Sequence, residues 1–452
     1  MASNPIQQRI NQVCIKWEDA KKYKGARCVR ILCQPDELDM VDTFYTYMIG
    51  SETPVADIAF LFDSDCIQPK NFSRLLLKEL EETMEVWSNS TKDERIEYTP
   101  VVWKAESNYA SDQNTAALFV KNFNQLADAM NIPDDYYAVA VFRNINNQAE
   151  FAAWIEKALE CGIGKNVKFL FHDVAGMNFY NHLSAKAGNA MATIPVNLNM
   201  AKAMEQCAAM GDPKDPATEY RVHFTKMMNA LGKNNESEAE AQGWKCLEIA
   251  NRNLSKDPNW ISQLIVVYTA LGNDKFRNKK QGEALEYANK AVDTAHTAQT
   301  VFENAAAEIL KAQALMFRAT ISFMSNHFGE AAADYAGAYE IYLKTGNTHL
   351  TIEACRMTGK SAIKSGLKDN AVKIMAEGLK VFKDYDKEIA TSSTLPYLIL
   401  QLLDTNHETF ISSEEISTIA GKFYGTQWRS VLKNWKENPQ AVQKNQPPLT
   451  VS

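Results

Sequence analysis

Asp63 and Asp65 are the residues whose type and spacing most directly suggest chemistry. They stand one residue apart at the end of a near-continuous apolar run, VADIAFLFD at 55–63, which is typical of a buried strand. Carboxylate oxygens at a strand end suit Mg²⁺ or Mn²⁺ and leave room for coordinated water. One hypothesis is therefore a metal-dependent enzyme. The alternative is that the strand simply ends here and Asp65 starts a turn.

The sequence Asp63-Ser64-Asp65 resembles the metal-binding DxD motif of nucleotide-sugar glycosyltransferases and, more loosely, that of phosphatases of the haloacid-dehalogenase type. Either resemblance implies glycosyl or phosphoryl chemistry assisted by a metal. Two departures weaken them. Cys66 stands where the phosphatase motif has Thr or Val, and little chain precedes the motif to form a nucleotide-binding half.

A second pair, His172 and Asp173, also ends an apolar run. A catalytic triad needs a Ser or Cys nucleophile beside such a pair, and neither an accompanying nucleophile nor a GxSxG motif is evident. A strand-end histidine with satisfied hydrogen bonds is the favoured interpretation.

Composition narrows the class of protein. The 452 residues carry a net charge of −7 with 46% hydrophobic and 23% charged residues, so wholesale disorder is excluded and neither nucleic acid nor membrane is expected as a partner. No CxxC pair or Cys/His cluster indicates zinc, and no signal peptide is evident. We therefore expect a cytoplasmic protein without cofactors, whose eight cysteines are mostly buried and reduced: 14, 28, 33, 66, 161, 207, 246 and 355.

The first half alternates short apolar runs with helical patterns. Helices are indicated at 71–87 and at 147–162, the latter beginning at an Asn cap and ending on Gly162. Such alternation predicts an α/β domain with a mainly parallel, doubly wound sheet. The strands are expected at 27–34, 55–63, 136–143, 167–174 and 191–198, with a weaker candidate at 98–105.

Sheets of this kind often bind nucleotides, but the phosphate-binding loops are missing. There is no GxxxxGK[ST], and GIGKN at 162–166 precedes a strand instead of following one. The first strand continues into PDELD and not into GxGxxG. The domain thus resembles a P-loop-like sheet without its motifs, and nucleotide hydrolysis of the usual kind is not expected.

The second half is rich in Ala and helical. Three stretches, 282–295, 329–342 and 369–382, share small or apolar residues at the same offsets, beginning at Ala284, Ala331 and Ala371. They resemble the second helix of a tetratricopeptide repeat, which implies an all-α solenoid of helical hairpins. Together with Ala239 of an earlier hairpin at 220–253, the spacings are 45, 47 and 40 residues, longer than the roughly 34 of the standard repeat. A generic helical bundle is the alternative.

The predicted organisation has four parts. A helical extension occupies 1–25, the α/β domain 26–215, the repeat domain 216–438 and a flexible tail 439–452. The segment NDKFRNKKQ at 273–281 is expected to lengthen one turn, and helices at 391–404 and 412–435 are expected to close the stack.

Such solenoids bind peptides or protein surfaces along the first helix of each hairpin. Arg356, Lys360 and Lys364 are spaced i, i+4, i+8 and form a basic ridge that suits an acidic segment, although many basic ridges are only solvated. The repeat alignment assigns these positions to the groove: Gln313, Met316, Thr320, Glu353, Arg356, Lys360 and Lys364.

The favoured hypothesis is a protein-interaction protein, namely an adaptor, scaffold or chaperone. The arrangement also resembles bacterial tetratricopeptide proteins that accompany secretion or contractile injection machinery. The alternative is the metal-dependent enzyme of Asp63 and Asp65, with glycosyltransferase- or phosphatase-like chemistry. A third hypothesis makes the front domain a platform for self-association.

Calorimetry separates the first two hypotheses. Titration with Mg²⁺ or Mn²⁺, with and without nucleotides or nucleotide sugars, is expected to show no binding if the chain only binds proteins. Binding that disappears in Asp63→Asn would instead favour the enzyme, because one of the two metal carboxylates is then lost.

Overall fold

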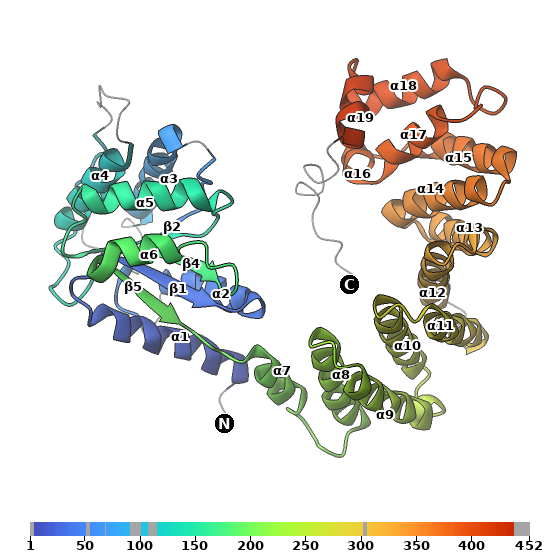
Figure 1. Ribbon diagram of the computed structural model, residues 1–452, viewed down its shortest axis with the longest axis horizontal. Coiled ribbons are helices and arrows are strands. Elements are labelled where there is room, and N and C mark those ends of the chain that lie inside the picture. The colour runs from blue at the N-terminus through green and yellow to red at the C-terminus, as the bar shows by residue number, and fades with distance from the viewer. Residues whose placement is uncertain are drawn as a thin grey trace. The chain divides into compact units, whose positions relative to one another are not determined.

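The computed structural model describes residues 4–50, 55–67, 69–90, 101–106, 115–301 and 305–437. The chain divides into two compact units, Met1–Cys207 and Ala208–Ser452 (Figure 1). All described strands belong to the first unit, and the described elements of the second unit are helices. The predicted fold class, an α/β domain followed by an all-α solenoid, is confirmed.

The sheet of unit 1 has five parallel strands in the order β2-β3-β4-β1-β5. Each strand falls within a predicted run. The weaker candidate strand at 98–105 is wrong for the residues that the structure describes. Residues 101–105 are not in a strand, and 98–100 lie outside the described residues. The strands are β1 (Cys28–Cys33), β2 (Ile58–Phe62), β3 (Ala138–Phe142), β4 (Val167–Val174) and β5 (Met191–Pro195).

Helices cover both faces of this sheet because alternate strand residues are apolar on each side. Phe62, Phe142 and Phe169 point to one face, and Val29, Val141 and Leu170 to the other. The first face packs against α3 (Pro69–Ser90), α4 (Thr115–Ala129), α5 (Gln148–Glu160) and α6 (Asn181–Ala187), and the second against α1 (Pro5–Lys21) and α2 (Leu38–Met48). Unit 1 also contains short 3₁₀ turns at Pro35–Glu37 and Gly188–Ala190, and α7 (Met200–Ala208) ends at the boundary between the units.

The predicted ends of α5 are confirmed in detail. The Asn147 side chain accepts a hydrogen bond from the backbone N–H of Glu150. Gly162 follows the helix with φ +83°, a left-handed conformation that favours glycine.

Unit 2 is a stack of helical hairpins (Figure 1). Paired helices pack against each other, and the first helices of neighbouring hairpins also touch, as α10 and α12 do. The hairpins are α8 (Pro216–Gly232) with α9 (Glu236–Leu254), α10 (Trp260–Arg277) with α11 (Gln281–Val301), α12 (Ala305–Met324) with α13 (Phe328–Thr345), and α14 (Thr348–Lys364) with α15 (Lys368–Phe382).

Small residues lie where the helices approach most closely. The predicted Ala239, Ala284, Ala331 and Ala371 are all on second helices and fully buried. On Gly378 a Cβ atom would lie 2.5 Å from the Sγ atom of Cys355, which is closer than real contacts. Larger side chains at these positions would force the helices apart.

Two details of the predicted boundaries are wrong. Residues 273–277 continue α10 and do not lengthen a turn, so only Asn278–Lys280 separates α10 from α11. The closing region has four helices where two were expected, because the chain breaks at Ser393–Thr394 and at Gly425 (φ +79°). They are α16 (Lys387–Ser392), α17 (Leu395–Leu403), α18 (Ser413–Tyr424) and α19 (Trp428–Glu437).

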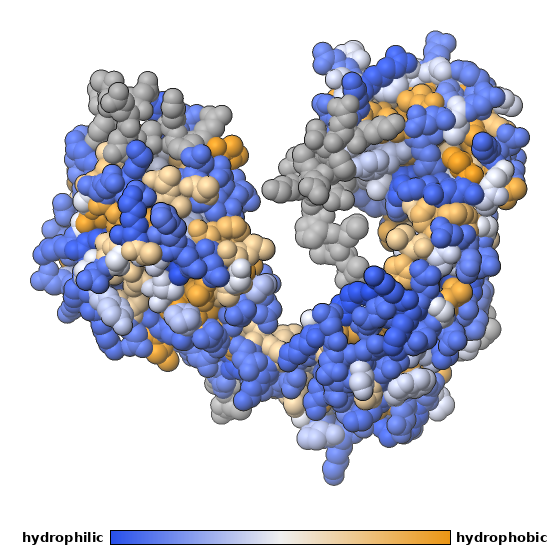
Figure 2. Space-filling model, viewed as in Figure 1, coloured by the Kyte–Doolittle hydropathy of each residue, from blue (hydrophilic) through white to orange (hydrophobic). Residues whose placement is uncertain are grey.

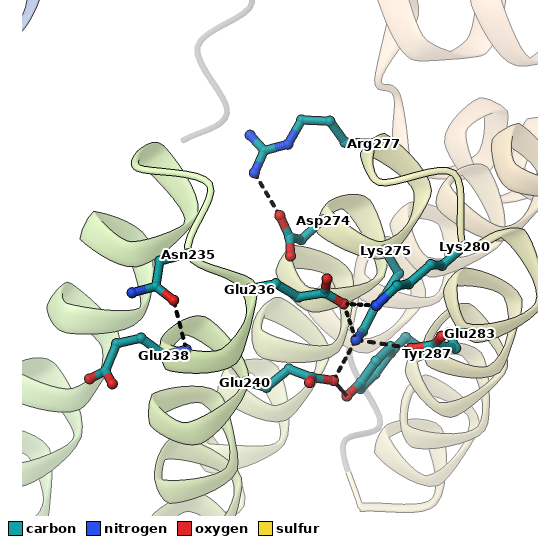
Figure 3. A network of polar contacts seen from close by, with 10 residues as sticks. All are labelled: Asn235, Glu236, Glu238, Glu240, Asp274, Lys275, Arg277, Lys280, Glu283 and Tyr287. Atoms are coloured by element: carbon teal, nitrogen blue, oxygen red, sulfur yellow. Dashed lines mark hydrogen bonds and ion pairs between the residues drawn. The ribbon is translucent and has the colours of Figure 1, made fainter.

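The extension of α10 places Lys275 inside a network of carboxylates (Figure 3). The buried Nζ atom lies 2.5 Å from Glu236, 2.8 Å from Glu240 and 2.9 Å from Glu283, which come from α9 and α11. Burial lowers the pKa of Lys275, but the hydrogen bonds with the three carboxylates outweigh this effect and hold the pKa above its ordinary value. The lysine therefore ties three helices together as a cation.

Two glycine substitutions test the close approach of the helices. Gly378→Ala is expected to lower the free energy of unfolding by about 1–3 kcal/mol, because the new methyl group meets Cys355. Gly421→Ala in α18 has nothing within 4 Å and is expected to stabilise by about 1 kcal/mol through helix propensity. Urea unfolding of the full chain measures both, and equal effects would contradict the packing explanation.

Candidate functional site

The carboxyl edge of the sheet in unit 1 is the first place to look for a ligand. In doubly wound sheets, ligands bind where neighbouring strands send their connections to opposite faces. Here β1 continues to α2 on one face, and the adjacent β4 continues to α6 on the other. The fold therefore has a switch point between β1 and β4.

Carboxylates of the chain itself accept the backbone N–H groups at this switch point. The buried carboxylate of Glu37 accepts from Gln34 (2.8 Å), Asn199 (3.3 Å) and Leu198. The buried carboxylate of Asp173 accepts from the N–H groups of Phe179 (3.2 Å) and Tyr180 (3.3 Å) at the start of α6. These amides, which could cradle a phosphate, are thus already hydrogen-bonded.

The same holds after β2 and β3, where the predicted metal ligands lie. Glu79 of α3 accepts from the N–H groups of Asp63 (2.7 Å) and Ser64 (2.9 Å). Asp65 accepts from the backbone N (3.0 Å) and the side-chain Nδ2 (2.9 Å) of Asn146. Both carboxylate oxygens of Asp65 therefore hold the loop that follows β3.

Asp63 has a different neighbour. Its carboxylate is mostly exposed and lies 3.7 Å from the Nε atom of Arg143, which is paired more closely with Asp42 (2.8 Å). Within the described ranges, no group of three His, Cys, Asp or Glu side chains could hold a metal ion. Asp63 and Asp65 thus face separate partners in this structure.

His172 and Asp173 do not act as a pair, because adjacent strand residues point to opposite faces. The ring of His172 lies 6.2 Å from that of Tyr45 in α2, and burial lowers the pKa of His172. The expectation of satisfied hydrogen bonds is wrong for its buried Nδ1 atom, which has no hydrogen-bond partner among the described residues. Asp173 instead meets the start of α6 and Arg30 (3.2 Å) on the other face. Nearby Cys33 is buried, which raises its pKa to about 12, so it is not a reactive nucleophile.

Lys168, which the sequence did not single out, is a buried lysine near the amino-terminal ends of the strands, in β4. Its Nζ atom donates to the carbonyl oxygen of Ala26 (2.7 Å) and lies 4.4 Å from the ring centre of Tyr137. Burial lowers its pKa to about 8, and repulsion from Arg27 and Lys24 contributes. A lysine of this kind can act as a base, but this one is fully buried and its proton is held by the backbone.

The lowered pKa predicts a pH-dependent stability. The folded chain binds the Lys168 proton less well than the unfolded chain. Below pH 8 the buried amine is charged and lowers the free energy of unfolding by its full amount. As the pH rises from 8 toward 10.5 the folded chain loses this proton, and the destabilisation disappears. The stability of the natural chain relative to Lys168→Met should therefore increase by up to about 3 kcal/mol between pH 7 and pH 10.5. Urea unfolding of both chains at the two pH values measures this difference, and a constant difference would contradict it.

In unit 2, the predicted groove residues lie on two first helices. We define the α12–α14 face by Gln313, Met316 and Thr320 of α12 and Glu353, Arg356, Lys360 and Lys364 of α14. Met316 packs against the same buried cluster, Ala319, Ala331 and Tyr335, that Met357 of α14 contacts. The Thr320 hydroxyl lies 3.1 Å from that of Tyr335. Met316 and Thr320 of α12 and Met357 of α14 therefore meet around one cluster.

The basic ridge of α14 rests on aromatic rings. The Nζ atom of Lys360 lies 5.4 Å from the ring centre of Phe323, and that of Lys364 lies 5.8 Å from Phe323 and 5.0 Å from Phe328. Arg356 is different, because it forms two hydrogen bonds with Glu353 at 2.7 and 2.5 Å. The ridge thus combines two lysines over aromatic rings with one arginine in an ion pair.

The sequence reasoning missed Phe323, Phe328 and Met357. Phe323 stands three residues after Thr320, so the i, i+3 rule for one helix face could have found it. Phe328 and Met357 depend on how α13 and α14 pack, which short motifs do not reveal. Figure 2 shows hydrophilic residues over most of α8–α10 and a mixture of hydrophobic and hydrophilic residues over α12–α15.

The chain is thus a two-unit protein with a parallel sheet in one unit and a helical-hairpin stack in the other. No protein-family model and no curated protein matches it. Among solved structures it is similar to the apo form of RapI, with 12% identity over 83% of this chain and 84% of that chain and a TM-score of 0.33. A likeness of this size assigns no function. Among the described helices, none is both long and apolar enough to cross a membrane.

Proposed function

We propose that the chain is a protein-interaction protein, acting as an adaptor, scaffold or chaperone, that captures its partner on the α12–α14 face. The observation that carries this proposal is the ridge of Arg356, Lys360 and Lys364 beside Met316 and Phe323. Cations next to partly buried apolar side chains suit a protein segment that carries both acidic and apolar residues.

The sheet unit supports this proposal indirectly. Its loop amides are hydrogen-bonded to Glu37, Glu79, Asp65 and Asp173, so a phosphate-bearing substrate would have to displace them. The metal-dependent enzyme of Asp63 and Asp65 remains an alternative that the calorimetry decides. A link to a bacterial secretion or contractile injection system, and self-association through unit 1, also remain predictions.

An acidic segment is the partner chemistry that the ridge favours. Guanidinium and ammonium groups form charge-assisted hydrogen bonds with carboxylates. Because the lysines lie over aromatic rings, their side chains are held in place, and less conformational entropy is lost when a carboxylate binds.

Charge reversal tests the proposal. Arg356→Glu combined with Lys360→Glu is expected to reduce partner capture by at least about tenfold, because the ridge then repels an acidic segment. Thermal stability should fall modestly, because Arg356 and Glu353 are only 16% and 28% exposed and the new carboxylates at 356 and 360 repel that of Glu353. Thermal unfolding of the variant therefore shows whether the chain is still folded. The measurement is the amount of partner retained from an extract of the native source by the immobilised full chain.

Lys290→Glu is the matched control. Lys290 also lies over aromatic rings, 5.2 Å from Tyr287 and 5.7 Å from Trp244, but on α11, a second helix. This variant should retain the partner. Unchanged retention by the double variant would contradict the proposed face.

A further inference from the structure

Arg356, the first cation of the ridge, is already paired with Glu353. The two residues are one helical turn apart on α14, and the guanidinium donates from Nε and Nη2 to the two carboxylate oxygens. Their side chains are only 16% and 28% exposed. This two-point geometry is the one in which arginine recognises any carboxylate, including that of a partner.

Lys360 and Lys364 are not neutralised in this way. Among the described residues, no carboxylate lies within 4.0 Å of either Nζ atom. The pKa of Lys360 is lowered by burial and then by repulsion from Arg356 and Lys364. Positive charge therefore accumulates toward the C-terminal end of the ridge, while its N-terminal end is already paired.

We propose that Glu353 is a built-in competitor, whose carboxylate occupies Arg356 in the free chain and is replaced by a carboxylate of an acidic partner segment. This inference rests on the proposed function. Replacing one carboxylate by another conserves the two hydrogen bonds, so Arg356 adds little net affinity and instead selects a carboxylate of suitable geometry. The net attraction for the acidic segment therefore comes from Lys360 and Lys364, because replacing one carboxylate by another at Arg356 contributes little.

The spacing of the ridge defines the form of the segment. Arg356 and Lys364 are eight residues apart on one helix, a rise of about 12 Å. In an extended peptide, residues i and i+4 lie on the same side and about 13 Å apart. Three acidic residues on alternate positions of an extended segment would therefore match the three cations, the first of them displacing Glu353.

The test measures fluorescence anisotropy of a labelled Glu-Ser-Glu-Ser-Glu peptide with the full chain at low salt. Glu353→Gln keeps the size of the side chain but removes the competing charge, so this variant should bind about five- to tenfold more tightly than the natural chain. Adding Arg356→Gln should abolish the gain. Lys360→Gln with Lys364→Gln should weaken binding in both backgrounds.

Two control peptides and a stability measurement complete the design. Glu-Glu-Glu-Ser-Ser has the same composition with the wrong spacing, and Gln-Ser-Gln-Ser-Gln lacks the charges; both should bind more weakly. Thermal unfolding of each variant shows whether the chain is folded.

The outcomes separate the two levels of the proposal. If Glu353→Gln binds no more tightly than the natural chain while the lysine variant loses binding, the competitor is wrong and the proposed function stands. If both control peptides bind as well as the alternating peptide, the spacing and carboxylate recognition are wrong. If no chain binds the acidic peptide, the competitor is overturned, and the proposed function is then judged by the retention experiment alone.

Discussion

The close approach of paired helices is the constraint on which unit 2 depends. Fully buried alanines on the second helices, and Gly378 against Cys355, leave no room for larger side chains. At this separation Met316 of α12 and Met357 of α14 share one cluster, and Lys360 and Lys364 reach the ring of Phe323 on α12. Beneath the α12–α14 face, the small residues of this cluster are Ala319 of α12 and Ala331 of α13.

The charged side chains of the protein differ in what compensates their charge. Carboxylates such as Glu37 and Asp173 are used to satisfy backbone amides, as buried polar groups require. Lys275 is buried among three glutamates, where the loss of any partner would leave a costly charge. Among the described residues, no carboxylate lies within 4.0 Å of the Nζ atom of Lys360 or Lys364, which lie over aromatic rings instead. The ridge of α14 is therefore a surface where an external anion could supply a counter-charge.

The features that follow from local periodicity could be predicted from the sequence. The five strands, the Asn147 cap and the aligned alanines all depend on neighbours within a few turns. Features that depend on distant segments could not. Glu37 accepts from Leu198, 161 residues away, and α10 continues through 273–277 where Lys275 is held by carboxylates of α9 and α11. The basic ridge of α14 could be predicted from the i, i+4 spacing of its residues in the sequence. The contacts of its lysines with Phe323 and Phe328 could not, because they depend on how α12, α13 and α14 pack.

The network around Lys275 joins α9 of the first hairpin with α10 and α11 of the second. Repeat arrays are often regarded as strings of exchangeable modules, in which one unit can be removed, duplicated or swapped. The first two hairpins of this protein do not fit that description, because separating them would part the buried cation of Lys275 from two of its three counter-charges, Glu236 and Glu240. An exchange or duplication of repeats that keeps this network intact would have to include α8–α11 together.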